Sequence, residues 1–181
     1  DCINEIQKDF RVKGRIFRMS VSVGYAISEG GHTSCEEVVR RADVAMYLAK
    51  SRNPGEPVAY DKEYESNLFK NKQIDDALRA AMNAGDVMVR YQPIVNAGTG
   101  KMEMAEALIH WDPKHLGPMS PAQYIPIAEE SGLIVPLGLY VFQRVCEDLA
   151  EHPDLKVSVN LSPIQLLDPL LTDNLLTIVE S

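Results

Sequence analysis

A single carboxylate lies inside the segment Met104–Trp111, which otherwise has the composition of a buried strand. Side chains of a strand alternate between its two faces, so Glu106, Leu108 and His110 share one face. The other face is wholly apolar and suits packing against helices; it carries Ala105, Ala107, Ile109 and Trp111. A buried carboxylate without a partner is costly, which predicts a cation beside Glu106: a metal ion, an Arg or a Lys. A salt bridge in the core or a half-exposed strand explains this segment as well.

A second polar side chain closes the strand predicted at Lys156–Ser162. Asn160 offers an amide oxygen where this strand ends and a helix begins. Asn is also common as the cap of a helix at such a junction, which leaves a structural role open.

Within the segment from about Gln73 to the end of the chain, five motifs occur in a fixed order. They are YQPIV at 91–95, EAL at 106–108, SPxxYIPxAExxG at 120–132, LIVPLG at 133–138 and VNLS at 159–162. An EAL tripeptide alone carries no weight, but this ordered set resembles the first half of an EAL domain, the metal-dependent cyclic-di-GMP phosphodiesterase. The resemblance implies a (β/α)₈ barrel whose site lies at the C-terminal ends of the strands.

The EAL family hydrolyses cyclic-di-GMP to the linear dinucleotide with water activated by divalent metal ions. By resemblance, Glu106 and Asn160 match metal ligands, and their oxygen atoms suit Mg²⁺ or Mn²⁺. Gln92 and Leu108 match positions that contact the nucleotide. The resemblance places the remaining ligands and the general base beyond Ser181. We therefore expect no complete catalytic set in this chain, and no activity from its 181 residues alone.

His110 departs from the family pattern, which usually has an Arg there that grips a substrate phosphate. Imidazole is shorter than a guanidinium and mostly neutral near pH 7, so it cannot replace a bidentate Arg. We expect His110 to weaken phosphate recognition, unless another residue supplies the contact.

The N-terminal third has a resemblance of its own. SVSVGYA at 20–26 and RRADVAMYLAK at 40–50 are similar to the last part of a GGDEF domain, the diguanylate cyclase fold. The signature loop of that family is not in this chain. Lys50 matches a lysine that contacts nucleotide phosphate, although a Lys at the end of a helix is more often a partner of the helix dipole.

Two classes of function are compatible with these residues. The parent protein is either a cyclic-di-GMP phosphodiesterase or a degenerate EAL module that binds cyclic-di-GMP or a partner protein without turnover, for which His110 is the suggestive feature. The GGDEF remnant would be regulatory or dimerising. We expect a homodimer formed through the EAL or GGDEF parts.

Composition limits the partners further. The chain is 45% hydrophobic and 24% charged, as globular proteins are, and its net charge of -8 argues against a nucleic-acid polymer. No apolar run is long enough to span a membrane, and the first residues do not form a signal peptide. The cysteines are few and widely spaced, which indicates neither a disulfide framework nor a zinc site. We expect a cytoplasmic location, with a parent that could be membrane-anchored through another region.

The order of elements predicts an α/β protein: a partial (β/α)₈ EAL-type barrel preceded by the C-terminal part of a GGDEF-type α+β domain. We place the GGDEF part at 1–62, a linker helix at 63–84 with Asp61 as its cap, and the N-terminal half of the EAL domain at 85–181.

Local patterns predict the individual elements. Strict alternation over Ile16–Ala26 predicts one half-buried strand, which Val58–Tyr60 would join in a sheet. Thr33 and Glu36 have the spacing of a capping box before a helix that stops at Ser51–Gly55.

The EAL part has its own local signals. Val87–Val95 and Met102–Trp111 flank a Gly-rich loop, which predicts an antiparallel hairpin. Ser120-Pro121-x-Gln123 and Ser162-Pro163-x-Gln165 predict helix starts, and Pro136 predicts the start of a helix over Leu137–Glu151.

Overall fold

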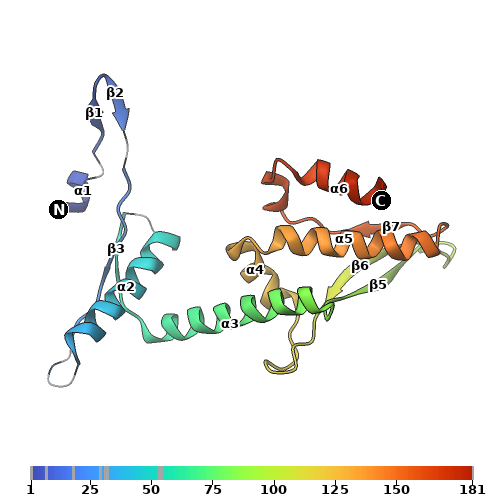
Figure 1. Cartoon of the computed structure of the whole chain (residues 1–181), viewed down its shortest axis with the longest axis horizontal. Coiled ribbons are helices and arrows are strands. Elements are labelled where there is room, and N and C mark those ends of the chain that lie inside the picture. The colour runs from blue at the N-terminus through green and yellow to red at the C-terminus, as the bar shows by residue number, and fades with distance from the viewer. Residues whose placement is uncertain are drawn as a thin grey trace. The chain divides into compact units, whose positions relative to one another are not determined.

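The computed structural model describes residues 2–6, 8–17, 19–28, 30, 33–52 and 55–180. The chain divides into two units, Asp1–Phe69 and Lys70–Ser181 (Figure 1). The division falls within one long helix, α3 (Lys62–Ala84).

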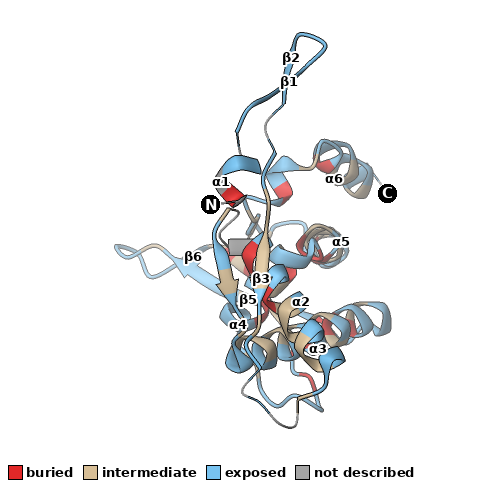
Figure 2. Ribbon diagram, turned by 90° about the vertical axis from the view of Figure 1, so that its left-hand side faces the viewer, coloured by how far each residue is buried: buried red, intermediate tan, exposed pale blue. Residues whose placement is uncertain are grey.

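The first unit begins with α1 (Cys2–Ile6) and a small antiparallel ribbon, β1 (Phe10–Val12) paired with β2 (Arg15–Phe17). Lys13 and Gly14 form its turn in the left-handed region, with φ of 49° and 78°. A two-residue turn of this kind matches the twist of a hairpin. All ribbon residues are exposed, as Figure 2 shows in pale blue.

This ribbon corrects the prediction of one half-buried strand over Ile16–Ala26. The structure has two separate strands there, β2 and β3 (Val23–Tyr25), because β2 pairs with its sequence neighbour β1 whereas β3 pairs elsewhere. The side chain of Phe17 is 49% exposed, so the alternating pattern did not mark a buried face here.

The strand β3 pairs in parallel with β4 (Pro57–Ala59), which confirms the predicted short sheet, and α2 (Cys35–Arg52) packs on β3. The approach is close at Gly24, where a Cβ atom would lie 1.9 Å from the backbone nitrogen of Met46. The helix cap is Ser34 rather than the predicted Thr33: Ser34 Oγ accepts a hydrogen bond from Glu37 N at 3.2 Å. The predicted stop at Ser51–Gly55 includes residues 53 and 54, which lie outside the described residues.

The long helix α3 begins as predicted, because Asp61 Oδ1 accepts a hydrogen bond from Glu63 N at 2.8 Å. Ile74, Leu78 and Ala81 in its second half are buried in the second unit. Gly85 follows the helix with a φ of 76°, a conformation that glycine adopts without strain.

The second unit is built on a three-stranded sheet in the order β5 (Met88–Val95), β6 (Met102–His110) and β7 (Val157–Val159). The strands β5 and β6 form the predicted antiparallel hairpin, and β6 pairs with β7 in parallel. Asn96 Oδ1 accepts hydrogen bonds from Gly98 N and Thr99 N at 2.9 and 3.0 Å, which stabilises the hairpin turn.

Two longer helices, α4 (Pro121–Ser131) and α5 (Ile134–Glu151), separate β6 from β7. The start of α4 is as predicted, and Ser120 N donates to Gln123 Oε1 at 2.9 Å. The helix α5 begins at Ile134, two residues before the predicted Pro136. Pro is tolerated there because backbone N–H groups in the first turn have no helical partner.

The segment after β7 differs from the prediction of a helix starting at Ser162. Gln165 Oε1 accepts a hydrogen bond from Ser162 N at 2.9 Å, but only a 3₁₀ turn, η1 (Gln165–Leu167), follows. Asp168 is extended with ψ at 115°, because the residue before Pro169 is disfavoured in helical conformation. The helix α6 (Leu171–Glu180) starts only after this break.

The core of the second unit lies between the sheet and helices α3, α4 and α5. Trp111 and Tyr124 pack edge to face, with ring centroids 5.4 Å apart. Ala105, Ala107 and Trp111 are each 3% exposed, so the apolar face predicted for this strand is buried as expected. Within the described parts of the chain, none of the helices has the length and apolar character needed to cross a membrane.

Candidate functional site

The three-stranded sheet of the second unit has a polar face, which lies opposite the buried face that carries Ala105 and Ala107. Strand register pairs Gln92 with Glu106 across β5 and β6, and Glu106 with Ser158 across β6 and β7. Paired residues of neighbouring strands present their side chains on the same face. Glu106 is half-buried on this face, whereas Gln92 is exposed.

Glu106 and Asn160 meet across the two parallel strands, although they are 54 residues apart in the sequence. The Asn160 amide nitrogen donates a hydrogen bond to Glu106 Oε1 at 2.7 Å. Asn160 directly follows β7, so the pair lies where the parallel strand ends, as the sequence predicted for Asn160. This contact partly satisfies the carboxylate that the strand pattern left without a partner.

The chemistry of this pair fits a divalent cation. A carboxylate and an amide both supply hard oxygen atoms, the ligands that Mg²⁺ and Mn²⁺ prefer. No group of three or more His, Cys, Asp or Glu side chains within ligand distance of one another is present among the described residues. Glu106 and Asn160 would therefore share such an ion with other oxygen donors.

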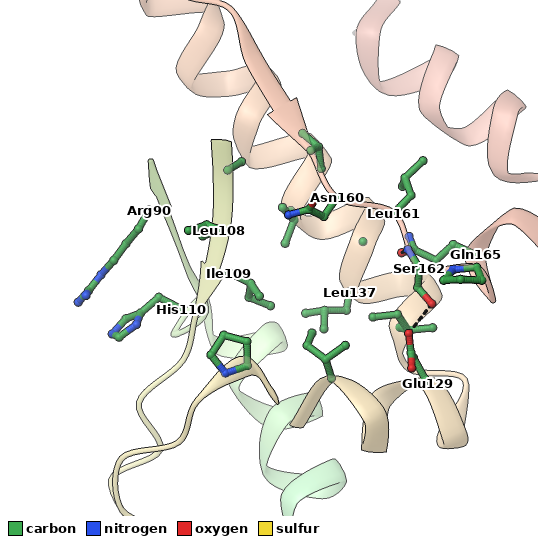
Figure 3. Close-up of a pocket in the computed structure, with 18 residues that line it drawn as sticks. Arg90, Leu108, Ile109, His110, Glu129, Leu137, Asn160, Leu161, Ser162 and Gln165 are labelled. Atoms are coloured by element: carbon green, nitrogen blue, oxygen red, sulfur yellow. Dashed lines mark hydrogen bonds between the residues drawn. The ribbon is translucent and has the colours of Figure 1, made fainter. Parts of the chain in front are cut away.

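A pocket of about 560 Å³ adjoins the ends of β6 and β7 (Figure 3). Leu108, His110 and Asn160 line it, so three of the predicted site residues border one cavity. Most of its lining is apolar and comes from β6, α4 and α5, through side chains such as Ile109 and Leu137. Glu106 and Gln92 are not among its lining residues.

Glu129 and Ser162 form a polar contact in this pocket that the sequence analysis missed. Ser162 Oγ donates to Glu129 Oε1 at 2.6 Å, as the dashed line in Figure 3 shows. The contact joins α4 to the segment that follows β7, two residues after Asn160. The family motifs contain both residues, but sequence spacing gave no signal that they touch.

Gln165 also fixes this segment. Its side chain is 2% exposed, and its Nε2 has no hydrogen-bond partner in the described structure. It packs against Gly138 of α5, where a Cβ atom would lie 1.9 Å from that nitrogen. Together with the contact at Ser162, this packing fixes the backbone beside Asn160.

The opposite face of β5 is anchored to α5 by Tyr91. The Tyr91 hydroxyl donates to Asp148, and burial together with this hydrogen bond raises the pKa of Tyr91 above its usual value. Tyr124 Oη donates to the Ile109 carbonyl oxygen at 3.3 Å, and burial raises the pKa of Tyr124 to about 12. Both tyrosines hold the strands whose other face carries the site.

Arg90 is a further residue of the site that the sequence analysis missed. It lies on β5 two residues before Gln92, on the same face, and it lines the pocket beside His110. The two-residue strand period of the segment already placed it on the face of Gln92. Only strand register, however, puts it beside His110.

Lys50 belongs to the first unit. It is exposed near the C-terminal end of α2, a position that also suits a partner of the helix dipole. Its nucleotide contact stays a prediction.

The fold and the site together define an α/β protein with a carboxylate on one strand and an amide at the end of the neighbouring parallel strand. Residues 75–181, more than half of the chain, match the family model described as EAL domain. The chain therefore belongs to the EAL domain family.

Relatives with assigned names cover most of this chain. Cyclic di-GMP phosphodiesterase PdeR of Escherichia coli is 36% identical over 153 residues, which are 82% of this chain and 23% of PdeR. Bifunctional diguanylate cyclase/cyclic di-GMP phosphodiesterase MucR of Pseudomonas aeruginosa is 30% identical over 177 residues, 95% of this chain and 26% of MucR. Such relatives are much longer: the chain spans 20% to 26% of the length of three that it matches.

Solved structures share the fold. One described as PaMucR phosphodiesterase in complex with c-di-GMP has a TM-score of 0.55 and 33% sequence identity, covering 60% of this chain and 46% of that one. The FimX EAL domain of Xanthomonas citri has a TM-score of 0.53 at 22% identity, covering 64% of this chain and 46% of that one, and bears on the fold alone. These similarities establish an EAL-type fold for the second unit.

Proposed function

We propose that the protein containing this chain hydrolyses cyclic-di-GMP to the linear dinucleotide. The observation that carries the proposal is the contact between Glu106 and Asn160 at 2.7 Å, inside the segment that matches the EAL family. The names of the relatives PdeR and MucR, and the c-di-GMP complex of the MucR phosphodiesterase, support the same substrate.

Glu106 and Asn160 would hold a divalent metal ion, Mg²⁺ or Mn²⁺, through their oxygen atoms. Such an ion, when bound, lowers the pKa of a water molecule and so makes it a nucleophile near neutral pH. Gln92, Leu108 and His110 would contact the nucleotide from the same face of the sheet. Because β5 and β6 are paired without a break from Met88 to Ile94, they hold these three side chains on a rigid element.

A non-catalytic EAL module that binds cyclic-di-GMP or a partner protein is the second candidate. His110 favours it, because an imidazole binds a phosphate more weakly than a guanidinium does. The two candidates share a ligand site and differ in turnover, so one assay separates them.

For the rest of the chain we propose the division made from the sequence. Residues 1–62 would be the C-terminal part of a GGDEF domain with Lys50 facing a nucleotide phosphate, 63–84 a linker helix, and 85–181 the N-terminal half of the EAL domain. The similarity to bifunctional MucR over 95% of this chain supports a GGDEF part before the EAL part. We also propose a homodimer through either part and a cytoplasmic location for this region.

The test is an assay of the full-length protein for the linear dinucleotide, with Mg²⁺, with Mn²⁺ and with a chelator. Glu106→Gln keeps the size of the side chain but removes the charge, and should lower turnover by ~100-fold or more. Glu103→Gln is the matched control: Glu103 lies on the same strand but its side chain accepts a hydrogen bond from Asn96. Equal turnover in Glu106→Gln and wild type would refute the metal role, and binding without turnover in wild type would favour the second candidate.

A further inference from the structure

We propose that Arg90 is the main phosphate-binding residue of this site and that it holds one phosphate of the ligand together with His110. The inference rests on the proposed function, because it assigns a specificity-determining residue to the same nucleotide site. Arg90 would supply the phosphate contact that the family usually makes with an Arg at the position of His110.

Strand register brings Arg90 and His110 together. Arg90 pairs with Leu108, and Met88 pairs with His110, so Arg90 and His110 are diagonal neighbours on one face of the β5–β6 hairpin. Diagonal neighbours of an antiparallel pair are ~7–8 Å apart, within reach of long side chains. Figure 3 shows the two side chains leaving adjacent strands in the same direction, with their ends side by side at the margin of the pocket.

Arg90 also differs from the other arginines of its unit, because its side chain has no partner among the residues that the structure describes. Residues 70–180 contain Arg79, Arg90 and Arg144, and the first and last of these pair with Asp75 and Glu147. Among the described residues, the side chain of Arg90 forms no ion pair or hydrogen bond, and the residue is exposed. Glu106 is near in register but takes its hydrogen bond from Asn160 instead. The guanidinium is therefore available to an external anion.

The charges of the face match a ligand that carries phosphate. A chain with a net charge of -8 repels an anion unless positive charge is supplied locally. The guanidinium of Arg90 can bind a phosphate through two parallel N–H groups, and the imidazole of His110 adds a further donor. Arg90 lies two residues from Gln92, the partner of Glu106, so the phosphate would bind beside the carboxylate–amide pair rather than on it.

The inference is tested by titrating cyclic-di-GMP into the full-length protein in a calorimeter, with a chelator present so that turnover cannot occur. Arg90→Ala should weaken binding by ~10- to 100-fold and flatten its dependence on salt. Arg90→Lys keeps the charge but loses the fork, and should weaken binding several-fold. Arg79→Ala, which removes an arginine paired on the surface of α3, should bind within about twofold of wild type.

The substitution His110→Arg provides a more discriminating test of the same inference. A guanidinium at residue 110 would lie beside the position that Arg90 occupies. In the Arg90→Ala background, His110→Arg should therefore raise the affinity for cyclic-di-GMP by at least ~10-fold. In the wild-type background, where Arg90 already binds the phosphate, the same substitution should raise the affinity by much less. The same gain in both backgrounds would overturn the inference, as would wild-type affinity in Arg90→Ala. If Arg90→Ala fails to fold by thermal melting, Arg90→Lys decides, and wild-type affinity there refutes a bidentate contact. A wild-type protein that does not bind cyclic-di-GMP would refute the proposed function, and this inference with it.

Discussion

Replacing Gly138 by Ala tests how closely the segment after β7 is packed on α5. A Cβ atom at residue 138 would lie 1.9 Å from Gln165 Nε2 and 2.8 Å from its Cδ, so the Gln165 side chain would have to move. Gln165 is 2% exposed, and its Oε1 accepts the hydrogen bond from Ser162 N. Movement large enough to relieve the contact would lengthen or break that bond.

The expected cost is the sum of three opposing contributions. Overpacking of a buried position costs ~1–3 kcal/mol, and a lost intramolecular hydrogen bond costs ~1 kcal/mol. Ala instead of Gly in a helix interior returns ~1 kcal/mol. The two unfavourable contributions together exceed the favourable one. The free energy of unfolding of Gly138→Ala should therefore be ~1–3 kcal/mol lower than that of wild type.

Urea unfolding of the chain, followed by tryptophan fluorescence, measures this change. Trp111 is the single tryptophan of the chain and is buried in the core of the second unit, so its signal reports that unit. The control is the same substitution in a Gln165→Ala background, where the contact is absent and Gly138→Ala should be neutral or stabilising by up to ~1 kcal/mol. Unchanged or increased stability of Gly138→Ala with Gln165 in place would refute the close packing.

Two further predictions concern pH and association. Burial raises the pKa of Tyr124 to about 12, above the ordinary value near 10, so its contribution to stability is complete below pH ~10 and is lost as pH rises toward 12. Urea midpoints across that range should fall less steeply in Tyr124→Phe, and an identical slope would contradict this. Exposed apolar side chains near the C-terminus, with Leu167 at 82% and Val179 at 63%, should make the 181-residue chain associate at high concentration. Light scattering checks it, and a monodisperse monomer would be the contrary result.

Patterns that depend on neighbouring residues were readable from the sequence. Alternation in Met104–Trp111 placed Glu106 opposite the apolar face, and the Gly-rich loop at 96–100 predicted the hairpin; the structure confirms both. The caps at Asp61 and Ser120 were predictable for the same reason, because a cap is a contact within a few residues.

Local patterns gave wrong strand and helix bounds where another pairing or capping partner competed with the predicted one. The alternating run from Ile16 was broken into two strands because β2 pairs with β1, and the helix predicted at Ser162 was interrupted at Asp168 before Pro169. Thr33 and Ser34 both suit a cap, and the chain uses Ser34. In these places the sequence offers more than one arrangement of similar local energy.

What the tertiary structure alone decided is which site residues meet. The sequence marked Glu106 and Asn160 as polar residues of two strands, but their hydrogen bond exists because β6 and β7 pair in one register. Arg90 gave no signal of its own, since a lone Arg on a strand face is ordinary; it gains meaning from lying diagonal to His110. Side-chain alternation has a period of two residues and is written in the sequence, whereas register depends on packing among segments many residues apart.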